Sequence, residues 1–503
     1  MSDTARALQP GIVPPAAEEE EIPAPGALSL RGMAGILLSS KSGKAALVMF
    51  AVMIAISIFV LVTYPRDFGT GRWSSPRVWA DNPKTAPPSW TRFYNDQAIE
   101  HQVIALTEPA STETRGPAEV RDFDAVIQHS SESAPQFLSA TITGVTFDAR
   151  APVIIISLIR PDGGEIRLAN IAVTGPRPGE EAPYERYFDT SERVLLTQQD
   201  TAAQSIAQWF ADQYPDSSIS DTLGNRLNEA LFGIPASDGS AGFESLQGAY
   251  TVRTQFLAAD PADEINEVEV IYGGNVFGWM GTDSLGRDLF EGLLYGFPVA
   301  LLIAAMAASL STLIGASLGI ISGYTGGLTD SVIQRLADIV SNIPLLPLLI
   351  FLVFIAGSNL YLIILVLVAF SWTGLTILVR SMVLQLRSGQ LVESAQALGA
   401  SKRRIMIRHV FPQVAPFIIA QMIFFAPGAI LAEASLSFLG LGDPSVPTWG
   451  QMLEAGFRTG ALYVGYWWWI IPPGLLIIIT ALAFMLLALG MEQVLDPRLR
   501  NPQ

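Results

Sequence analysis

The sequence predicts an all-α polytopic membrane protein with six transmembrane helices, into which an α+β domain is inserted. The 503-residue chain is 50% hydrophobic and only 15% charged, whereas soluble proteins average about 25% charged residues. Nearly all of its net charge of −16 falls between residues 66 and 280. A polar domain is therefore joined to a nearly neutral, apolar remainder. The chain has no cysteine, which excludes a disulfide framework and a thiolate metal site.

The N-terminal part of the chain predicts a tail followed by one membrane span. Residues 1–29 are rich in Pro, Ala and Glu and lack apolar periodicity, so we expect a disordered cytoplasmic tail. Residues 45–63 form an unbroken apolar run, close to the ~20 residues that cross a bilayer core. Arg31, Lys41 and Lys44 precede that run. Because cytoplasmic flanks carry an excess of cations, residues 30–64 are predicted to leave the cytoplasm with this first span.

Residues 65–280 show the patterns of a small α+β domain, which this topology places outside the cytoplasm. Strands are expected within residues 136–174, 249–257 and 264–272, and helices at 201–214 and 221–232. Near its start, Trp73, Trp79 and Trp90 either lie at the membrane surface or pack inside the domain. The domain shows no nucleophile elbow, metal-ligand spacing or glycine-rich phosphate loop. We therefore expect no catalytic site in it.

The remaining residues, 281–503, predict a bundle of five further spans with a cytoplasmic C-terminal tail. The spans are expected at residues 297–321, 332–356, 360–380, 413–432 and 467–490. Prolines and small residues recur inside them, which favours closely packed helices that can rearrange over simple anchors. The aromatic run at 466–469 would then lie at the outer interface as part of an aromatic belt.

The polar stretch at residues 390–412 is the longest patterned interruption in this apolar part. Leu391, Ser394, Ala395 and Leu398 have helical spacing, so a short amphipathic helix is expected. Gly399 suits the left-handed conformation that ends a helix, and Ser401 can cap a second one. Pro412 begins the next apolar span, a position where proline is tolerated. The cations between Ser401 and Pro412 indicate that residues 390–412 form a cytoplasmic helix–turn–helix between two spans.

Two further segments stand out. Residues 281–296 contain Leu285, Leu289, Leu293 and Gly296 at roughly helical spacing, with Gly286 weakening the start of that helix. Asp283, Arg287 and Asp288 are expected to form a local ion-pair lattice. Glu433 lies at the end of the fifth predicted span. An acid inside a membrane is a functional candidate by default. A structural hydrogen bond near the surface is the simpler interpretation, and we favour it.

These motifs resemble those of one family, the C-type membrane permeases of dipeptide and oligopeptide ABC importers. Residues 390–412 look like the EAA loop that docks into the ATPase, with these matching positions: Glu393, Ser394, Ala395, Leu398, Gly399 and Pro412. Ser394 and Phe411 depart from the usual residues but keep size or apolarity. The GTDxLGRD segment before the second span is matched by Gly281, Thr282, Asp283, Leu285, Gly286, Arg287 and Asp288. The run after Glu433 and the C-terminal LDPRLR also match.

The resemblance implies a type I ABC importer permease fold in a bacterial or archaeal cell membrane, with both termini cytoplasmic. The expected partners are a homologous B-type permease, one or two cytoplasmic ATPase subunits, an extracytoplasmic solute-binding protein and membrane lipid. No nucleic acid is expected. ATP and magnesium would bind to the ATPases, because this chain has no GxxxxGK[ST] loop, and it would be no enzyme itself. The chain would form half of a translocation pathway for peptides, with Glu393 to Gly399 receiving the motion of the ATPases.

Three alternatives to a peptide permease remain open at this stage. The same family carries other solutes, such as nickel chelates or oligosaccharides. A membrane receptor with an outer sensing domain would need a cytoplasmic signalling domain, yet the cytoplasmic segments are short. An ion-driven transporter would need acids or histidines near the middle of the membrane, and we find few of these.

Overall fold

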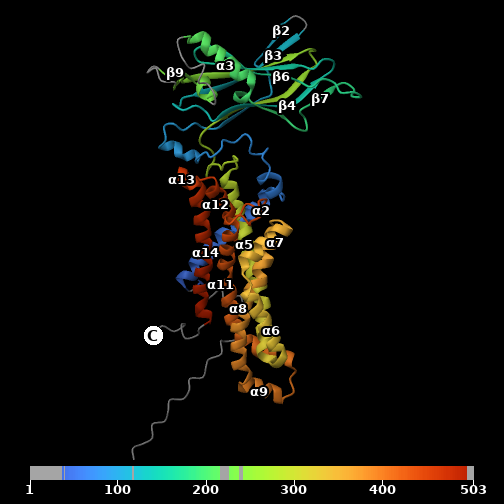
Figure 1. Ribbon diagram of the computed structural model, residues 1–503, viewed down its shortest axis with the longest axis vertical. Coiled ribbons are helices and arrows are strands. Elements are labelled where there is room, and N and C mark those ends of the chain that lie inside the picture. Colours follow the sequence, from blue (N-terminus) through green and yellow to red (C-terminus); the bar gives the residue numbers. More distant parts are fainter. Residues whose placement is uncertain (1–36, 39, 116–117, 216–225, 237–241, 496–503) are drawn as a thin grey trace, which may run out of the picture.

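The computed structural model describes residues 37–38, 40–115, 118–215, 226–236 and 242–495. Figure 1 shows two parts along its longest axis, a domain of strands at one end and a bundle of long helices at the other. We call the strand part, residues 102–273, the β-domain. The two segments that join it to the bundle, residues 64–101 and 274–288, are called the neck. The predicted tail at 1–29 lies outside the described residues.

The β-domain is built from two antiparallel sheets around one core. The first sheet has the order β1-β12-β4-β7, with β8 also paired to β4: β1 (Gln102–Leu106), β12 (Glu264–Gly273), β4 (Phe137–Phe147), β7 (Tyr184–Arg186) and β8 (Glu192–Leu195). The second has the order β2-β3-β11-β5-β6: β2 (Ser111–Arg115), β3 (Ala118–His129), β11 (Gly248–Ala258), β5 (Val153–Ile159) and β6 (Glu165–Ala172). A separate short ribbon pairs β9 (Gly233–Pro235) with β10 (Phe243–Ser245).

The core lies between the two sheets because alternate side chains of the strands point inward. In β11, Tyr250, Val252 and Phe256 are buried, and they share one apolar cluster with Ile142 of β4 and Val268 of β12. The hairpin between β5 and β6 turns at Gly163, which has a positive φ of 83°. The strands predicted at 249–257 and 264–272 are confirmed as β11 and β12.

The helices of the β-domain differ in part from the prediction. Helix α3 (Asp200–Gln213) agrees with the segment predicted at 201–214, and it packs on β6 through Ala202, Ile206 and Phe210. In the second segment, only α4 (Leu227–Leu231) is helical among the described residues, and residues 221–225 lie outside them. Strands β1, β2 and β3 were not predicted. In β2 and β3, charged residues interrupt the apolar alternation, and β1 has only five residues.

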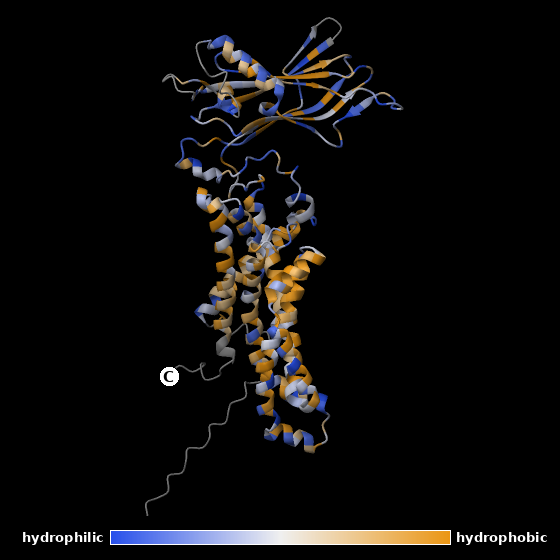
Figure 2. Ribbon diagram, viewed as in Figure 1, coloured by the Kyte–Doolittle hydropathy of each residue, from blue (hydrophilic) through white to orange (hydrophobic). Residues whose placement is uncertain are grey.

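The bundle contains five described helices that are long and apolar enough to cross a membrane. These are α2 (Lys41–Thr63), α5 (Leu289–Thr325), α8 (Leu360–Arg387), the run from α10 (Lys402–Ile405) into α11 (Phe411–Phe438), and α14 (Trp467–Leu495). Hydrophobic residues run along these helices, whereas hydrophilic residues are interspersed through the β-domain (Figure 2). Shorter helices complete the bundle: α9 (Gln390–Ala397), α12 (Trp449–Arg458) and α13 (Ala461–Val464).

The span predicted at residues 332–356 is not one straight helix. This region forms α6 (Gly327–Asn342) and α7 (Leu345–Ala356), which are bent by 79° relative to each other. Pro344 sits at the break, where it lacks the N–H that would continue the helix. Among the described helices there are thus five spans, or six if the bent pair counts as one.

Two of the tryptophans near the start of the predicted domain are buried against the bundle. Trp73 and Trp79 are 3% and 2% exposed, and their cluster includes residues of α5 and α14, so they pack against the bundle and not inside the β-domain. In the predicted aromatic belt, Trp468 and Trp469 are also buried, while Trp467 is 36% exposed. The Trp73 ring packs directly against α5 at Gly292. A glycine allows this contact, because a Cβ at that position would lie 2.5 Å from the ring.

Candidate functional site

The segment at residues 390–412 forms two short helices at the end of the bundle opposite the β-domain (Figure 1). The predicted turn is present, because Gly399 has φ 77° between α9 and α10. The Ser401 hydroxyl accepts a hydrogen bond from the Arg404 N–H at 3.4 Å and caps α10. A π-helical turn, η5 (Met406–Val410), then leads into α11.

The apolar face of α9 is not the one that the spacing suggested. Val392 and Ala395 are buried, whereas Leu391 and Leu398 are 48% and 88% exposed. Val392 and Ala395 pack in a cluster with residues of α5 and α8, which decides the orientation of the helix. Leu398, the residue that the helical spacing placed on the buried face, is left projecting at the turn.

The exposed surface of this segment carries the residues that the resemblance singled out. Glu393, Ser394, Leu398, Gly399 and Pro412 are all exposed, and Ala395 alone of the set is buried. Lys402, Arg403 and Arg404 are exposed on the neighbouring α10. We call the exposed residues Glu393, Ser394, Leu398, Gly399, Lys402, Arg403, Arg404 and Pro412 the loop surface.

The loop surface rests on a rigid base. Val392 and Ala395 of α9 and Ile405 of α10 are packed with Ile320 and Val383 of the long helices α5 and α8. In the same region, Gln396 Nε2 donates to the Tyr324 hydroxyl at 3.3 Å. A force applied to α9 would therefore act directly on α5 and α8.

The segment at residues 281–288 is not helical, so Leu285 does not belong to the predicted helix, whereas Leu289, Leu293 and Gly296 do. Helix α5 begins only at Leu289, Leu285 is 55% exposed and Gly286 has φ 81°. The helix starts there because the Asp288 carboxylate accepts a hydrogen bond from the Phe290 N–H at 2.8 Å, which makes Asp288 its N-cap. Burial raises the pKa of Asp288 to about 6.

The predicted ion-pair lattice is confirmed only for one pair. The buried Asp283 carboxylate accepts hydrogen bonds from Arg287 Nε at 2.5 Å and from the N–H groups of Leu285 and Arg287. Asp288 does not join this pair. The Arg287 guanidinium also lies over the Trp73 ring, 4.4 Å from its centroid.

Hydrogen bonds from residues 281–288 join the two segments of the neck. The Thr282 hydroxyl donates to the Pro83 carbonyl at 2.7 Å and accepts from the Ala86 N–H at 2.9 Å. The Thr85 N–H donates to the Asp283 carbonyl at 2.9 Å. In this structure the segment therefore braces the chain that enters the β-domain against the chain that leaves it.

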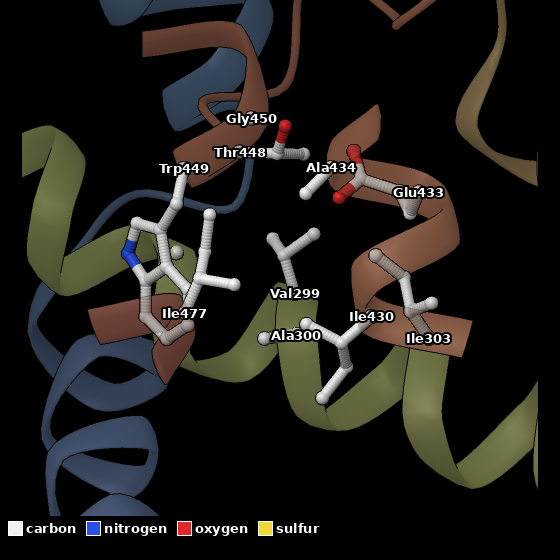
Figure 3. Close-up of a pocket in the computed structure, with 11 residues that line it drawn as sticks. Val299, Ala300, Ile303, Ile430, Glu433, Ala434, Thr448, Trp449, Gly450 and Ile477 are labelled. Atoms are coloured by element: carbon white, nitrogen blue, oxygen red, sulfur yellow. The ribbon is translucent and has the colours of Figure 1, made fainter. Parts of the chain in front are cut away.

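Glu433 lies inside the bundle. Its side chain is 4% exposed, and the favoured hydrogen bond exists: Ser437 Oγ donates to Glu433 Oε1 at 2.6 Å. Figure 3 shows the carboxylate beside Thr448 at the edge of a small pocket that is otherwise largely apolar. The pocket is lined by residues of α5, α11, α12 and α14, among them Val299, Ile303, Trp449 and Ile477.

The structure does not bring the three predicted segments together. The loop surface lies at one end of the bundle, the 281–288 segment lies in the neck at the other end, and Glu433 lies in a pocket within the bundle (Figures 1 and 3). No group of three or more His, Asp or Glu side chains that could hold a metal ion occurs among the described residues.

One polar cluster beside the loop surface was missed by the sequence analysis. Arg380 of α8 binds Asp330 of α6 through two hydrogen bonds of 2.6 Å. Ser322 of α5 also donates to Asp330, and Gln334 Nε2 donates to Ser322 Oγ at 3.1 Å. The pairing joins three helices. No spacing rule could have found it, because its two charges are 50 residues apart.

Comparison with known proteins decides the family. Residues 315–501 match the family described as binding-protein-dependent transport system inner membrane component. The dipeptide transport system permease protein DppC of Bacillus subtilis is 38% identical over 224 residues, which are 44% of this chain and 69% of that protein. This chain belongs to that family. It is a transmembrane permease subunit, and its family is one of importer components anchored in the inner membrane.

Other relatives match a similar share of this permease. The oligopeptide transport system permease protein OppC of Bacillus subtilis is 37% identical over 44% of this chain and 72% of its own length. The glutathione transport system permease protein GsiD of Pectobacterium atrosepticum is 35% identical over 48% of this chain and 77% of its own length. The family match includes the whole loop surface but begins after the β-domain.

Proposed function

We propose that this permease forms half of the translocation pathway of an ATP-driven importer of di- and oligopeptides, and that partner ATPases act on it through the loop surface. The observation that carries the proposal is the loop surface itself. An exposed Leu398 and an exposed Glu393 stand on a base that is buried against α5 and α8. A single exposed leucine is common on protein surfaces. The support lies in its position on a base packed against two long helices, because a partner that contacts this surface would act on α5 and α8.

The proposal that the substrate is a peptide is supported by the names of the relatives. The three compared proteins are named for dipeptide, oligopeptide and glutathione transport, and glutathione is itself a short peptide. The proposed partners are a homologous B-type permease, one or two ATPase subunits that bind ATP and magnesium, and a solute-binding protein. The permease itself would catalyse no reaction.

The proposed orientation places the loop surface in the cytoplasm and the β-domain outside it. Three exposed cations, Lys402, Arg403 and Arg404, favour a cytoplasmic loop. The β-domain lies at the other end of the bundle (Figure 1), so the same orientation puts it on the side from which a solute-binding protein would deliver peptide.

Thiol labelling tests this orientation, because the chain has no cysteine of its own. A cysteine at Val126, which is 54% exposed on β3, is expected to react with a membrane-impermeant reagent in intact cells whose outer envelope, if present, has been permeabilised. A cysteine at the exposed Lys402 is expected to react only after the inner membrane is opened. The reverse pattern would overturn the orientation.

The coupling role predicts that Gly399→Val and Glu393→Arg leave the permease in the membrane but uncouple ATP hydrolysis from transport. Gly399 has φ 77°, and a β-branched residue held there costs about 1–3 kcal/mol of strain. Peptide uptake and ATPase activity would be measured together in proteoliposomes that hold the complete transporter. We expect most of the uptake to be lost while ATP is still hydrolysed.

Gly460 provides a matched control for the backbone strain. It has φ 76°, and like Gly399 it has open space around the position of a Cβ, but it precedes α13 at the far end of the bundle. Gly460→Val should impose similar strain and keep uptake coupled to ATP hydrolysis. If Gly399→Val imports peptide as fast as the unmodified permease, the loop surface does not couple transport.

A further inference from the structure

The neck and the adjoining end of the bundle carry an exposed group of aromatic and aliphatic side chains. Three of its members are among the most exposed large side chains of the described residues: Tyr463 is 83%, Phe93 81% and Trp279 73% exposed. We call the full group the neck collar, and it consists of Trp90, Phe93, Tyr94, Trp279, Leu462, Tyr463, Val464 and Trp467.

Contacts among four of its members hold that part of the neck collar in place. Trp90, in the 3₁₀ turn η2 (Ser89–Phe93), lies 5.6 Å from Trp467 and 6.4 Å from Tyr94 between ring centroids. Its indole Nε1 donates to the Trp279 carbonyl at 2.9 Å. The two segments of the neck therefore contact each other, and the first of them also contacts Trp467, the first residue of α14. These contacts fix the positions of the rings that they join.

Helix α13 adds the aliphatic part of the neck collar. Gly460 and Gly465 flank it with φ of 76° and 88°, conformations that glycine adopts at little cost. They turn the chain sharply before and after α13, with Ala461 buried beneath it. Leu462 and Val464 are 61% and 63% exposed, on either side of the exposed Tyr463 ring.

The neck collar continues a stripe of exposed apolar residues along α14. After Trp467 the stripe consists of Ile471, Leu475, Ile478, Leu482, Met485 and Leu489. From Trp467 to Leu489 the helix rises about 33 Å at ~1.5 Å per residue, and a bilayer's hydrocarbon core is about 30 Å thick. The stripe therefore matches the thickness of the hydrocarbon core, and the neck collar begins where the stripe ends.

The composition of the neck collar fits the layer just beyond that core. Trp and Tyr rings are enriched at the boundary between hydrocarbon and water, because one end of the ring is apolar and the other can hydrogen-bond. Only 33% of the apolar window of α14 is buried, compared with 56% for α5 and α8. This helix lies at the periphery of the subunit, where lipid is the expected neighbour.

We propose that the neck collar lies in the headgroup layer of the bilayer and that the lipid surface is its partner. The membrane would then hold the neck, and with it the β-domain, at a fixed height above the bundle. This inference goes beyond the proposed function and does not depend on the transported solute or on which side of the membrane the β-domain lies.

Spin labels on single cysteines test the proposal. Phe93→Cys and, as an independent variant on another segment, Tyr463→Cys would be labelled in the complete transporter in phosphatidylcholine–phosphatidylglycerol vesicles. Collisions with oxygen, which concentrates in lipid, would be compared with collisions with a water-soluble nickel chelate. Ile478→Cys, 64% exposed in the middle of the α14 stripe, and Val126→Cys, 54% exposed on β3, are the lipid and water references.

The expected result is an oxygen-to-nickel collision ratio between the two references for both neck collar positions. A ratio equal to that of Val126→Cys would show that the neck collar lies in water and would overturn the proposal. Labels that neither probe reaches would show that a protein partner covers the surface, which would also overturn it. If one variant fails to fold, the other decides the question by itself.

Discussion

Replacing Gly319 by leucine is expected to prevent α5 and α8 from packing and to remove most folded permease from the membrane. Gly315, Gly319 and Gly323 face α8 at intervals of four residues. A Cβ at Gly319 would lie 2.8 Å from Val379 Cβ and 2.9 Å from the Thr376 carbonyl oxygen. Backbone atoms cannot give way as a flexible side chain can, so the whole helix would have to move.

These glycines also allow α5 and α8 to approach each other closely. Thr376 Oγ1 donates to the Gly315 carbonyl at 3.1 Å, a contact between helices that exists only while they are this near. In a bilayer such packing and hydrogen bonding replace the hydrophobic effect as the force between helices. Forcing extra atoms into a packed interface costs about 1–3 kcal/mol or more, and leucine adds three methyl-sized groups beyond the Cβ.

Gly374 of α8 provides the control for this substitution. No atom lies within 4 Å of the position where its Cβ would be, so Gly374→Leu should be tolerated. Both variants would be compared by the amount of monodisperse protein extracted from membranes and by its midpoint of thermal aggregation. Equal yields and midpoints for Gly319→Leu and the unmodified permease would contradict the close-packing argument.

The sequence could predict this interface in kind but not its partner. The recurrence of glycine, alanine and serine between residues 303 and 319 indicates helices that approach closely. It does not say which helix is the neighbour, and the structure shows that it is α8. The missed pair of Asp330 and Arg380 has the same cause, since both residues lie near predicted helix ends and only the packing of α6 on α8 brings them together.

Periodicity also gave the position of α9 but the wrong buried face. Its apolar residues fall on more than one side, and a helix of eight residues offers too few of them to define a stripe. Val392 is buried because α5 and α8 happen to lie on its side of the helix. In the neck, Gly281 and Gly286 have positive φ, and a pattern based on apolar spacing takes no account of the turns they make.

Arg160→Leu is the second change for which we expect a large effect, here on the β-domain alone. The Arg160 side chain is fully buried, and its charge is paired with Asp162 at 3.1 Å. It donates to three carbonyl oxygens around α4 and β9, those of Ala230 at 2.9 Å, Leu231 at 2.7 Å and Gly233 at 2.9 Å. Its guanidinium also lies 4.4 Å from the centroid of the Trp209 ring.

Leucine is smaller than arginine and has no donor, so it leaves these carbonyl oxygens without their partner. Each buried group that loses its hydrogen bond costs about 1–3 kcal/mol, and three carbonyl oxygens lose theirs here. The Asp162 carboxylate is 29% exposed, so water can replace its lost partner at little cost. From the carbonyl oxygens we expect a loss of about 3 kcal/mol or more in the free energy of unfolding of the β-domain. The bundle does not contact Arg160 and should keep its stability.

Arg253→Leu gives a comparison with the same chemical change at the surface. Arg253 forms a two-bond pair with Asp124, but the two side chains are 33% and 23% exposed. Partly exposed pairs contribute about 0–1 kcal/mol. Limited proteolysis of the full-length permease in detergent should therefore cut the β-domain of Arg160→Leu at a much lower urea concentration than that of Arg253→Leu. If both variants became sensitive at the same urea concentration, the buried guanidinium would not be what holds α4 and β9 to the sheets.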